Sequence, residues 1–392
     1  MLHRFAPFAP VLAAMLVSQM AMGLMGPLIP LLLVAEGETA TRIGMVASAY
    51  ALGFGVGALG GGAVVRRLGH ARAFALFATL AALATLALAA TEGASAWIGM
   101  RGLIGFGNAG LCVVAEGWLN ARAGNANRGR VLSAYLLVTW GGGALAPLAI
   151  QVAGADAWLF IPAALAFLAA ILPMYGATGP ALAPDCPMPA RVPLLVLWRA
   201  APSGLVCCAA AGLCNGVFYA LAPVYLAALE MEVGPVALFM STVSLAGLAV
   251  QMPVGFAADR MGRAGTAVAL MAVATAAAVL FALAGAASWL LLAGIGAVFA
   301  AATAPLYGLG VGLLGDRLTA GEAVAASGTL LLIWALAAAI GPVVAGWAIG
   351  WLGPAGMFAY LAAVTIAMGL FTGAWMLLGT RPMDADMTGT QP

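Results

Sequence analysis

Long apolar runs separated by short polar segments make up most of the chain. Each run approaches or exceeds the roughly 20 residues that an α-helix needs to cross a bilayer. The runs are continuously apolar, whereas strands of a membrane barrel alternate apolar and polar residues. The pattern predicts an all-α polytopic membrane protein with twelve transmembrane helices, near 9–34, 43–65, 73–91, 96–119, 131–153, 157–175, 201–229, 234–257, 265–286, 288–314, 323–350 and 354–379.

Composition supports this pattern. Hydrophobic residues make up 65% of the chain and charged residues 7%, which is too few charges for a water-facing surface. The first run has a basic flank, as a secretory signal does, but it exceeds the signal's apolar stretch of about 7–15 residues. We therefore expect the first run to remain as the first span.

A short connector occurs twice, at positions 62–70 (GAVVRRLGH) and 255–263 (GFAADRMGR). Both copies follow the pattern G-x-x-x-x-R-x-G-basic, and each lies between two apolar runs. Pro30 and Pro223 recur at the same spacing, and Ala146-Pro147 and Gly341-Pro342 at nearly the same spacing. The sequence therefore predicts two six-helix bundles, 1–176 and 200–392, joined by a cytoplasmic Pro-rich linker at 177–199.

Charge indicates how the chain is inserted. All 15 basic residues are arginine, and all except Arg42 and Arg101 lie at the termini or in even-numbered loops. Acidic residues gather in odd-numbered loops. The positive-inside rule then places both termini on the cytoplasmic side, and we expect the protein to lie in a bacterial-type inner membrane. Because the net charge of +2 follows from insertion, it gives no support for nucleic-acid binding.

Cysteine and histidine are too sparse to suggest redox or metal chemistry. Four of the 5 cysteines lie inside predicted spans, where they act as small apolar residues. Both histidines lie near the predicted cytoplasmic surface. We expect no disulfide, no metal site and no cofactor.

Several motifs resemble those of the major facilitator superfamily, and the resemblance covers the chain from end to end. The family's loop motif, G-x-x-x-D-R-x-G-R-R/K, is matched by the second connector at Gly255, Asp259, Arg260, Gly262 and Arg263. The first connector keeps Gly62, Arg67 and Gly69 but has Arg66 in place of the usual acid. Further matches are Arg101-x-x-x-Gly105-x-Gly107, Arg128-Gly129-Arg130 and Gly341-Pro342, while Glu116-Gly117-Trp118-Leu119-Asn120 and Gly69-His70-Ala71-Arg72-Ala73-Phe74 resemble the YcaD-like subgroup.

The resemblance implies two halves that rock about a site at the membrane midplane, with contacts that break and reform at the cytoplasmic ends. Its gate residues would be Arg67, Arg72, Asp259, Arg260 and Arg263. The alternative is that the arginines serve only as topology determinants, and it stays open for Arg66 and Arg263. Topology would not require an acid, so Asp259 favours the gate.

Two charged residues lie within the fourth run, on one helical face with Gly105, Asn108 and Cys112. A charge in hydrocarbon is costly and is normally kept for function or pairing. Arg101 is a candidate for coupling or substrate binding, with a structural hydrogen-bonding role as the alternative. Glu116 is expected to form a gate ion pair with Arg67, Arg72 or Arg130, with a proton-carrier role as its alternative.

Polar and aromatic residues on runs that line the cavity in this family are the candidate substrate contacts: Gln19, Met22, Asn108, Asn215, Tyr219, Thr303 and Tyr307, with Trp140 and Trp334 closing the sides. The alternative is that they are interface anchors and interhelical hydrogen bonders. The scarcity of buried charge argues for a neutral, amphipathic or singly charged cargo.

Three functional classes follow from these features. The first is a monomeric secondary transporter that moves a small molecule across the lipid bilayer by alternating access, with proton coupling as an option. The second is a non-transporting homologue that acts as a sensor or assembly factor. An enzyme would need a clustered catalytic constellation, and the sequence shows none, so we predict that the protein is not an enzyme.

Overall fold

The computed structural model describes residues 7–123, 127–176, 193–285 and 287–378. Its helices are α1 (Ala9–Ala35), α2 (Ala40–Leu68), α3 (His70–Ala89), α4 (Ala94–Arg122), α5 (Arg128–Leu145), α6 (Leu148–Ala153), η2 (Ala157–Leu159), α7 (Phe160–Ala169), α8 (Ile171–Gly176), α9 (Leu194–Ala200), α10 (Pro202–Ala228), α11 (Val233–Ala249), α12 (Gln251–Met261), α13 (Arg263–Ala284), α14 (Trp289–Thr303), α15 (Leu306–Gly315), α16 (Ala320–Leu352) and α17 (Gly356–Leu378). They form 12 segments that are long and apolar enough to cross a membrane, which confirms the predicted fold class.

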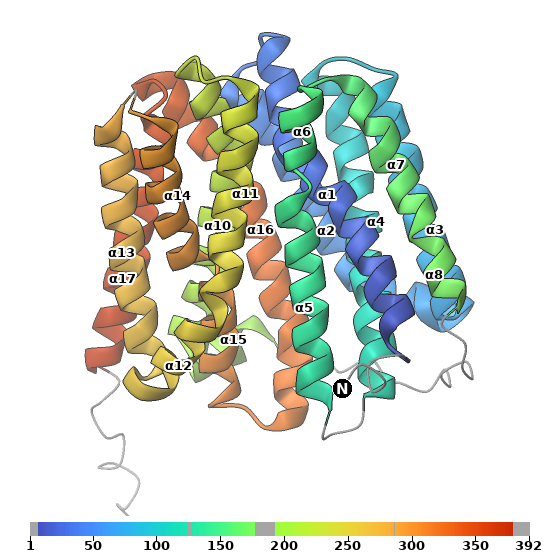
Figure 1. The fold of residues 1–392 in the computed structure, drawn as a ribbon. Coiled ribbons are helices and arrows are strands. Elements are labelled where there is room, and N and C mark those ends of the chain that lie inside the picture. Colours follow the sequence, from blue (N-terminus) through green and yellow to red (C-terminus); the bar gives the residue numbers. More distant parts are fainter. Residues whose placement is uncertain (1–6, 124–126, 177–192, 286, 379–392) are drawn as a thin grey trace, which may run out of the picture.

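Two groups of helices stand side by side in Figure 1, α1–α8 in blue to green and α10–α17 in yellow to red. The predicted linker falls between them. Its residues 177–192 lie outside the described residues, and its last part forms the short helix α9. The boundaries of the two bundles stay a prediction.

Four spans contain a break, and in the sixth span α7 ends and α8 begins at Ala170. Pro147 separates α5 from α6, and Pro305 separates α14 from α15. Because proline has no backbone N–H and its ring clashes with the preceding turn, it interrupts the helical hydrogen-bond ladder. The eighth span changes from α11 to α12 at Val250. Hydropathy predicted each of these spans as one uninterrupted run, and that prediction was too simple.

Connectors with positive φ recur in both halves. They are Gly37, Gly69, Gly93 and Gly154 in the first half and Glu230, Gly262, Gly285 and Gly353 in the second. Taken in order, the two sets fall in the same four connectors: between spans one and two, two and three, three and four, and five and six of each half. The agreement supports the internal repeat that the sequence predicts.

Glu230 is the one non-glycine residue with positive φ in the described chain, at 58°, and it stands where the first half has Gly37. The left-handed region costs an L-residue about 1–2 kcal/mol. Glycine loses more conformational entropy on folding, which offsets about 0.5–1 kcal/mol of the strain that it relieves. We expect Glu230→Gly to stabilise the protein by about 0.5–1 kcal/mol, measured as a higher melting temperature in detergent.

The control for this substitution is Glu232→Gly in the same connector. Glu232 has an ordinary φ of −60°, so glycine relieves no strain there. This variant should melt at or slightly below the wild-type temperature. A lower melting temperature for Glu230→Gly would contradict the strain argument.

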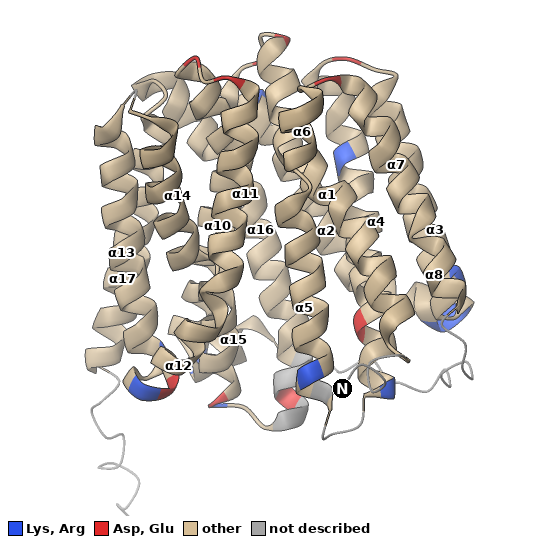
Figure 2. Cartoon of the chain, viewed as in Figure 1, with Lys and Arg blue, Asp and Glu red and all other residues tan. Residues whose placement is uncertain are grey.

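Charges separate toward the two ends of the bundle (Figure 2). The upper edge carries acidic residues, and the lower edge, where the described chain begins, carries most of the arginines together with further acidic residues. We call the first the acidic face and the second the arginine-rich face. The separation follows the predicted insertion, in which the arginine-rich face is cytoplasmic.

Contact between the halves is closest where α2 and α16 cross near the acidic face. A Cβ on Gly44 would lie 2.7 Å from the Pro342 carbonyl carbon, and one on Gly346 would lie 2.6 Å from Thr41 Cα. Deeper in the bundle, the Ser48 hydroxyl donates a hydrogen bond to the Ala339 carbonyl. These contacts bring backbone against backbone, which glycine permits because it lacks a side chain.

The same two helices separate toward the arginine-rich face. A Cβ on Gly55 would still lie 3.1 Å from Ala335 Cβ. Continuing the antiparallel register would bring Gly60 opposite Gly328, yet a Cβ on either meets nothing within 4 Å. Along this helix pair, α2 and α16 touch near the acidic face and no longer do so at Gly60 and Gly328.

Candidate functional site

A chain of polar side chains crosses the N-terminal half at mid-depth. Gln19 of α1 donates from Nε2 to Asn108 Oδ1 at 2.8 Å, and Asn108 donates from Nδ2 to the Tyr50 hydroxyl at 3.0 Å. Asn108 lies at the midpoint of α4 (Ala94–Arg122). The structure thus brings together two predicted cavity residues and adds Tyr50 of α2. Interhelical hydrogen bonds of this kind hold side chains in fixed positions in an apolar environment.

Arg101 lies next to this chain, on the side toward the acidic face. Its guanidinium carbon stacks 4.5 Å from the centroid of the Tyr50 ring. The residue is 8% exposed, and its Nε and Nη1 atoms are buried without a hydrogen-bond partner. The aromatic face offers partial compensation for the charge. The structural hydrogen bonds expected in the alternative reading are not formed by these two donors.

Glu116 lies on the same helix toward the arginine-rich face. Its Oε1 accepts a hydrogen bond from the Tyr135 hydroxyl of α5 at 3.1 Å. The Glu116 side chain is exposed although it lies within a span.

The expected ion pair of Glu116 with Arg67, Arg72 or Arg130 is wrong for this conformation. Among described side chains, the ion pairs are Arg42 with Glu38 and Arg263 with Asp316. Tyr135 provides a neutral partner instead.

In the C-terminal half, α10 carries unpartnered polar atoms. Asn215 Oδ1 and the Tyr219 hydroxyl are buried without hydrogen-bond partners, as is the Tyr360 hydroxyl of α17. Trp334 reaches across to the N-terminal half, where its ring packs 5.9 Å from that of Phe54. Trp334 therefore lies at a contact between the two groups of helices, and its role in closing one side of a cavity stays a prediction.

Three other cavity candidates are placed differently. Thr303 is 0% exposed and its hydroxyl donates to the Phe299 carbonyl at 3.1 Å, so it lines no cavity in this conformation. The break at Pro305 also separates it from Tyr307, so the two do not share one helical face. Met22 is partly buried and packs against the main apolar core, which includes residues of both halves. Trp140 is 38% exposed on α5.

Both connectors fold alike. Gly69 ends α2 and Gly262 ends α12, with φ of 77° and 78°, and the next helix starts at the following residue in each. Gly62 and Gly255 do not bring helices together here: a Cβ on Gly62 meets only Arg66 Nη1, at 3.9 Å, and one on Gly255 meets nothing within 4 Å.

The predicted gate residues do not meet across the halves. Arg67, Arg72, Asp259 and Arg260 are exposed, and none belongs to an ion pair in the described part of the chain. Arg263 pairs with Asp316 inside the C-terminal half. This arrangement fits the separation of α2 from α16 toward the arginine-rich face.

Sequence reasoning missed Tyr50, Tyr135 and Asp316. Tyr50 and Tyr135 are the kind of polar aromatic residue inside an apolar run that could have been singled out. Aromatic residues in a span also serve as packing and interface residues, so the sequence alone does not distinguish these roles. Asp316 follows the tenth span with no local motif. Its role depends on a contact that spacing alone does not show.

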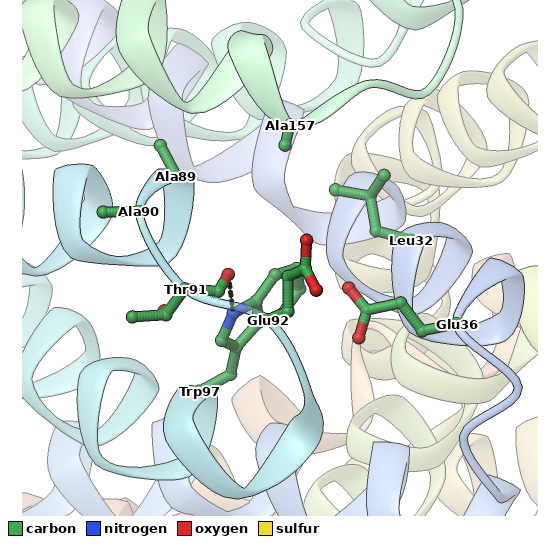
Figure 3. A pocket seen from close by; sticks show the side chains of 8 residues that line it. All are labelled: Leu32, Glu36, Ala89, Ala90, Thr91, Glu92, Trp97 and Ala157. Carbon is green, nitrogen blue, oxygen red and sulfur yellow. Dashed lines mark hydrogen bonds between the residues drawn. The ribbon is translucent and has the colours of Figure 1, made fainter.

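A pocket of about 470 Å³ opens at the acidic face, between the ends of α1, α3 and α4 (Figure 3). Glu36 and Glu92 direct carboxylates toward it, and Trp97 donates from Nε1 to the Thr91 carbonyl at 3.0 Å. Within the described ranges, no three His, Cys, Asp or Glu side chains gather as metal ligands. The pocket is remote from the mid-depth polar chain.

Twelve apolar spans in two groups of helices, with polar groups at mid-depth, are typical of a membrane transporter. The chain belongs to the Major Facilitator Superfamily, whose sequence model matches residues 11–236. It is 30% identical over 258 residues to the uncharacterized MFS-type transporter Ent638_1421 of Enterobacter sp., covering 66% of this chain and 68% of the relative. The uncharacterized MFS-type transporter YcaD of Salmonella arizonae is 28% identical over 258 residues, which cover 66% of this chain and 68% of that relative.

Solved structures agree on the fold. Crystal structures of the nucleoside transporter NupG superpose with TM-scores of 0.80 for its D323A mutant and 0.79 for the other structure, at 14% and 13% identity. They cover 93% and 96% of this chain and 99% and 100% of NupG. The protein is therefore a multi-pass membrane transporter for a small molecule, and not an enzyme.

Proposed function

We propose that the protein carries a small neutral, amphipathic or singly charged solute across a bacterial inner membrane by alternating access. Both termini and the arginine-rich face lie in the cytoplasm. The observation that supports this proposal is the contact of α2 with α16. The two helices touch near the acidic face, from Gly44 to Ser48, and do not touch at Gly60. This conformation is inward-facing.

The solute binds between the mid-depth polar chain and the facing surface of α10. Gln19 and Asn108 contribute amide groups, and Asn215 and Tyr219 contribute polar atoms that lack partners. A multiply charged solute would require several buried charges of opposite sign. Arg101 is the one arginine buried within the described spans, which favours a neutral or singly charged solute.

Closure of the cytoplasmic side brings Asp259 and Arg260 toward Arg67 and Arg72. All four are exposed in the inward-facing state and available for new contacts. Glu116 takes the proton-carrier role that was the alternative in the sequence, because its partner is a phenol and not an arginine.

Paired cysteines test alternating access directly. Gln151→Cys with Gly234→Cys reports closure at the acidic face, where a Cβ on Gly234 lies 3.6 Å from Gln151 Cγ. Gly60→Cys with Gly328→Cys reports closure at the arginine-rich face. We expect cross-linking of one pair to exclude cross-linking of the other. Simultaneous full cross-linking of both pairs in one molecule would overturn alternating access.

Transport itself is tested in proteoliposomes with an imposed pH gradient and a panel of labelled neutral and monoanionic compounds. Asp259→Asn should slow uptake of any transported compound and reduce cross-linking of the Gly60 and Gly328 pair. If no compound is transported and Asp259→Asn leaves the cellular phenotype unchanged, the non-transporting sensor or assembly role replaces this proposal.

A further inference from the structure

Arg101 is a buried cation, and two of its three guanidinium nitrogens have no acceptor. It is 8% exposed, and its Nε and Nη1 atoms lack hydrogen-bond partners. Neither ion pair in the described chain includes it. A buried charge without a partner is destabilising, so its retention calls for a ligand or a function.

The Tyr50 hydroxyl offers a further donor on the residue that stacks against this guanidinium. Gln19 donates to Asn108, and Asn108 donates to the oxygen of Tyr50. The Tyr50 hydroxyl therefore accepts along this chain and keeps its own proton to donate. The Tyr50 ring lies under the guanidinium, so a phenolic O–H accompanies two guanidinium nitrogens that lack acceptors.

A carboxylate fits such a set of donors. Arginine presents its N–H groups as a planar fork, and the two oxygens of a carboxylate can accept in parallel from Nη2 together with either Nε or Nη1. One cation balances one negative charge, whereas a dianion would bring a second, uncompensated charge into the low-dielectric interior. The hydrogen-bonded amides of Gln19 and Asn108 remain for the neutral part of the same molecule.

We propose that Arg101 and Tyr50 form the binding site for the carboxylate of a monoanionic solute, and that this solute is the cargo. Only the statement that the solute is the cargo rests on the proposed transport function. The site itself is a separate claim about equilibrium binding.

The site is tested by thermal unfolding of the full chain in detergent with sodium acetate, sodium benzoate, sodium chloride and the neutral isostere benzamide. We expect a carboxylate to raise the wild-type melting temperature above the chloride and benzamide values. In Arg101→Gln the half-saturating carboxylate concentration should rise by at least about tenfold, the loss expected when a charged hydrogen-bond partner is removed. The second variant, Arg101→Lys, keeps the charge without the fork and should give an intermediate value.

Arg122→Gln is the matched control. Its guanidinium also stacks on an aromatic ring, 4.0 Å from the Trp118 ring centroid, but it lies in the last turn of α4 outside the polar chain. This variant should keep the wild-type carboxylate shift. Ligand-free Arg101→Met should melt at or above the wild-type temperature, because it removes an unpaired buried charge.

The proposal fails if neither carboxylate shifts melting beyond benzamide and chloride, or if Arg101→Gln responds as the wild type does. A carboxylate shift that depends on Arg101, found in a protein that transports nothing, would retain the binding site and reject the transport function. If the protein transports a compound that has no carboxylate, and Arg101→Gln leaves that transport unchanged, the transport function is retained and this binding site is rejected.

Discussion

Replacing Gly44 with valine should prevent closure of the acidic face and abolish transport. A single Cβ at this position would lie 2.7 Å from the Pro342 carbonyl carbon and 3.2 Å from the Val343 nitrogen. Both neighbours are backbone atoms, which cannot swing aside as a flexible side chain can. The larger side chain of valine must therefore push α2 away from α16.

The size of this effect follows from the cost of overpacking, which is about 1–3 kcal/mol. Because about 1.4 kcal/mol changes an equilibrium constant tenfold, the inward-facing population should fall by roughly 5- to 150-fold. Cross-linking of Gln151→Cys with Gly234→Cys is the measurement. It should decrease sharply in the Gly44→Val background, and it needs no identified substrate.

Two further substitutions define the specificity of this result. Gly346→Val approaches the same interface from α16, where a Cβ would lie 2.6 Å from Thr41 Cα, and it should reproduce the effect. Gly350→Val lies on the same helix with nothing within 4 Å and should leave cross-linking unchanged. Equal cross-linking in all three variants would show that the halves do not close through this contact.

Much of the architecture could be predicted because hydrophobic burial in a bilayer depends on run length and composition. The twelve apolar runs became twelve spans, and the repeated connectors became two helix ends with glycines at φ of 77° and 78°. The breaks were harder to predict. Hydropathy does not distinguish Pro305, which separates two helices, from Pro342, which lies inside α16.

The mid-depth site was predicted in part. Gln19 and Asn108 meet because isolated amides within a span have few partners other than each other. Thr303 gave a false signal, because a threonine hydroxyl can bond to the carbonyl one turn earlier on its own helix. Its polarity therefore said nothing about a cavity.

Contacts that depend on conformational state could not be predicted. One sequence must satisfy both the inward-facing and the outward-facing arrangement, so a charge pattern that suits the closed gate is still present when that gate is open. Arg67, Arg72, Asp259 and Arg260 are exposed for this reason. The ion pair predicted for Glu116 failed in the same way, since its neighbour here is Tyr135.

Replacing Glu116 with glutamine should uncouple transport from the proton gradient. Glu116 and Asp259 are the acids within the described spans, and Asp259 lies in the last turn of α12. Glu116 accepts a hydrogen bond from Tyr135 and belongs to no ion pair in the described part of the chain. It can therefore take up and release a proton without breaking an ion pair. Glutamine keeps the size and the hydrogen bond but cannot carry that proton.

Proteoliposomes loaded with a pH-sensitive dye provide the measurement, because solute-driven proton movement is visible without labelled compounds. Gradient-driven uptake in Glu116→Gln should fall by roughly 5- to 150-fold, the usual range of a coupling free energy, while exchange of solute for solute continues. Glu92→Gln, an exposed acid outside the spans, should keep both activities. Loss of exchange together with uptake would instead assign Glu116 to the gate, because a gate residue is needed for every passage through the membrane and a proton carrier only for the driven one.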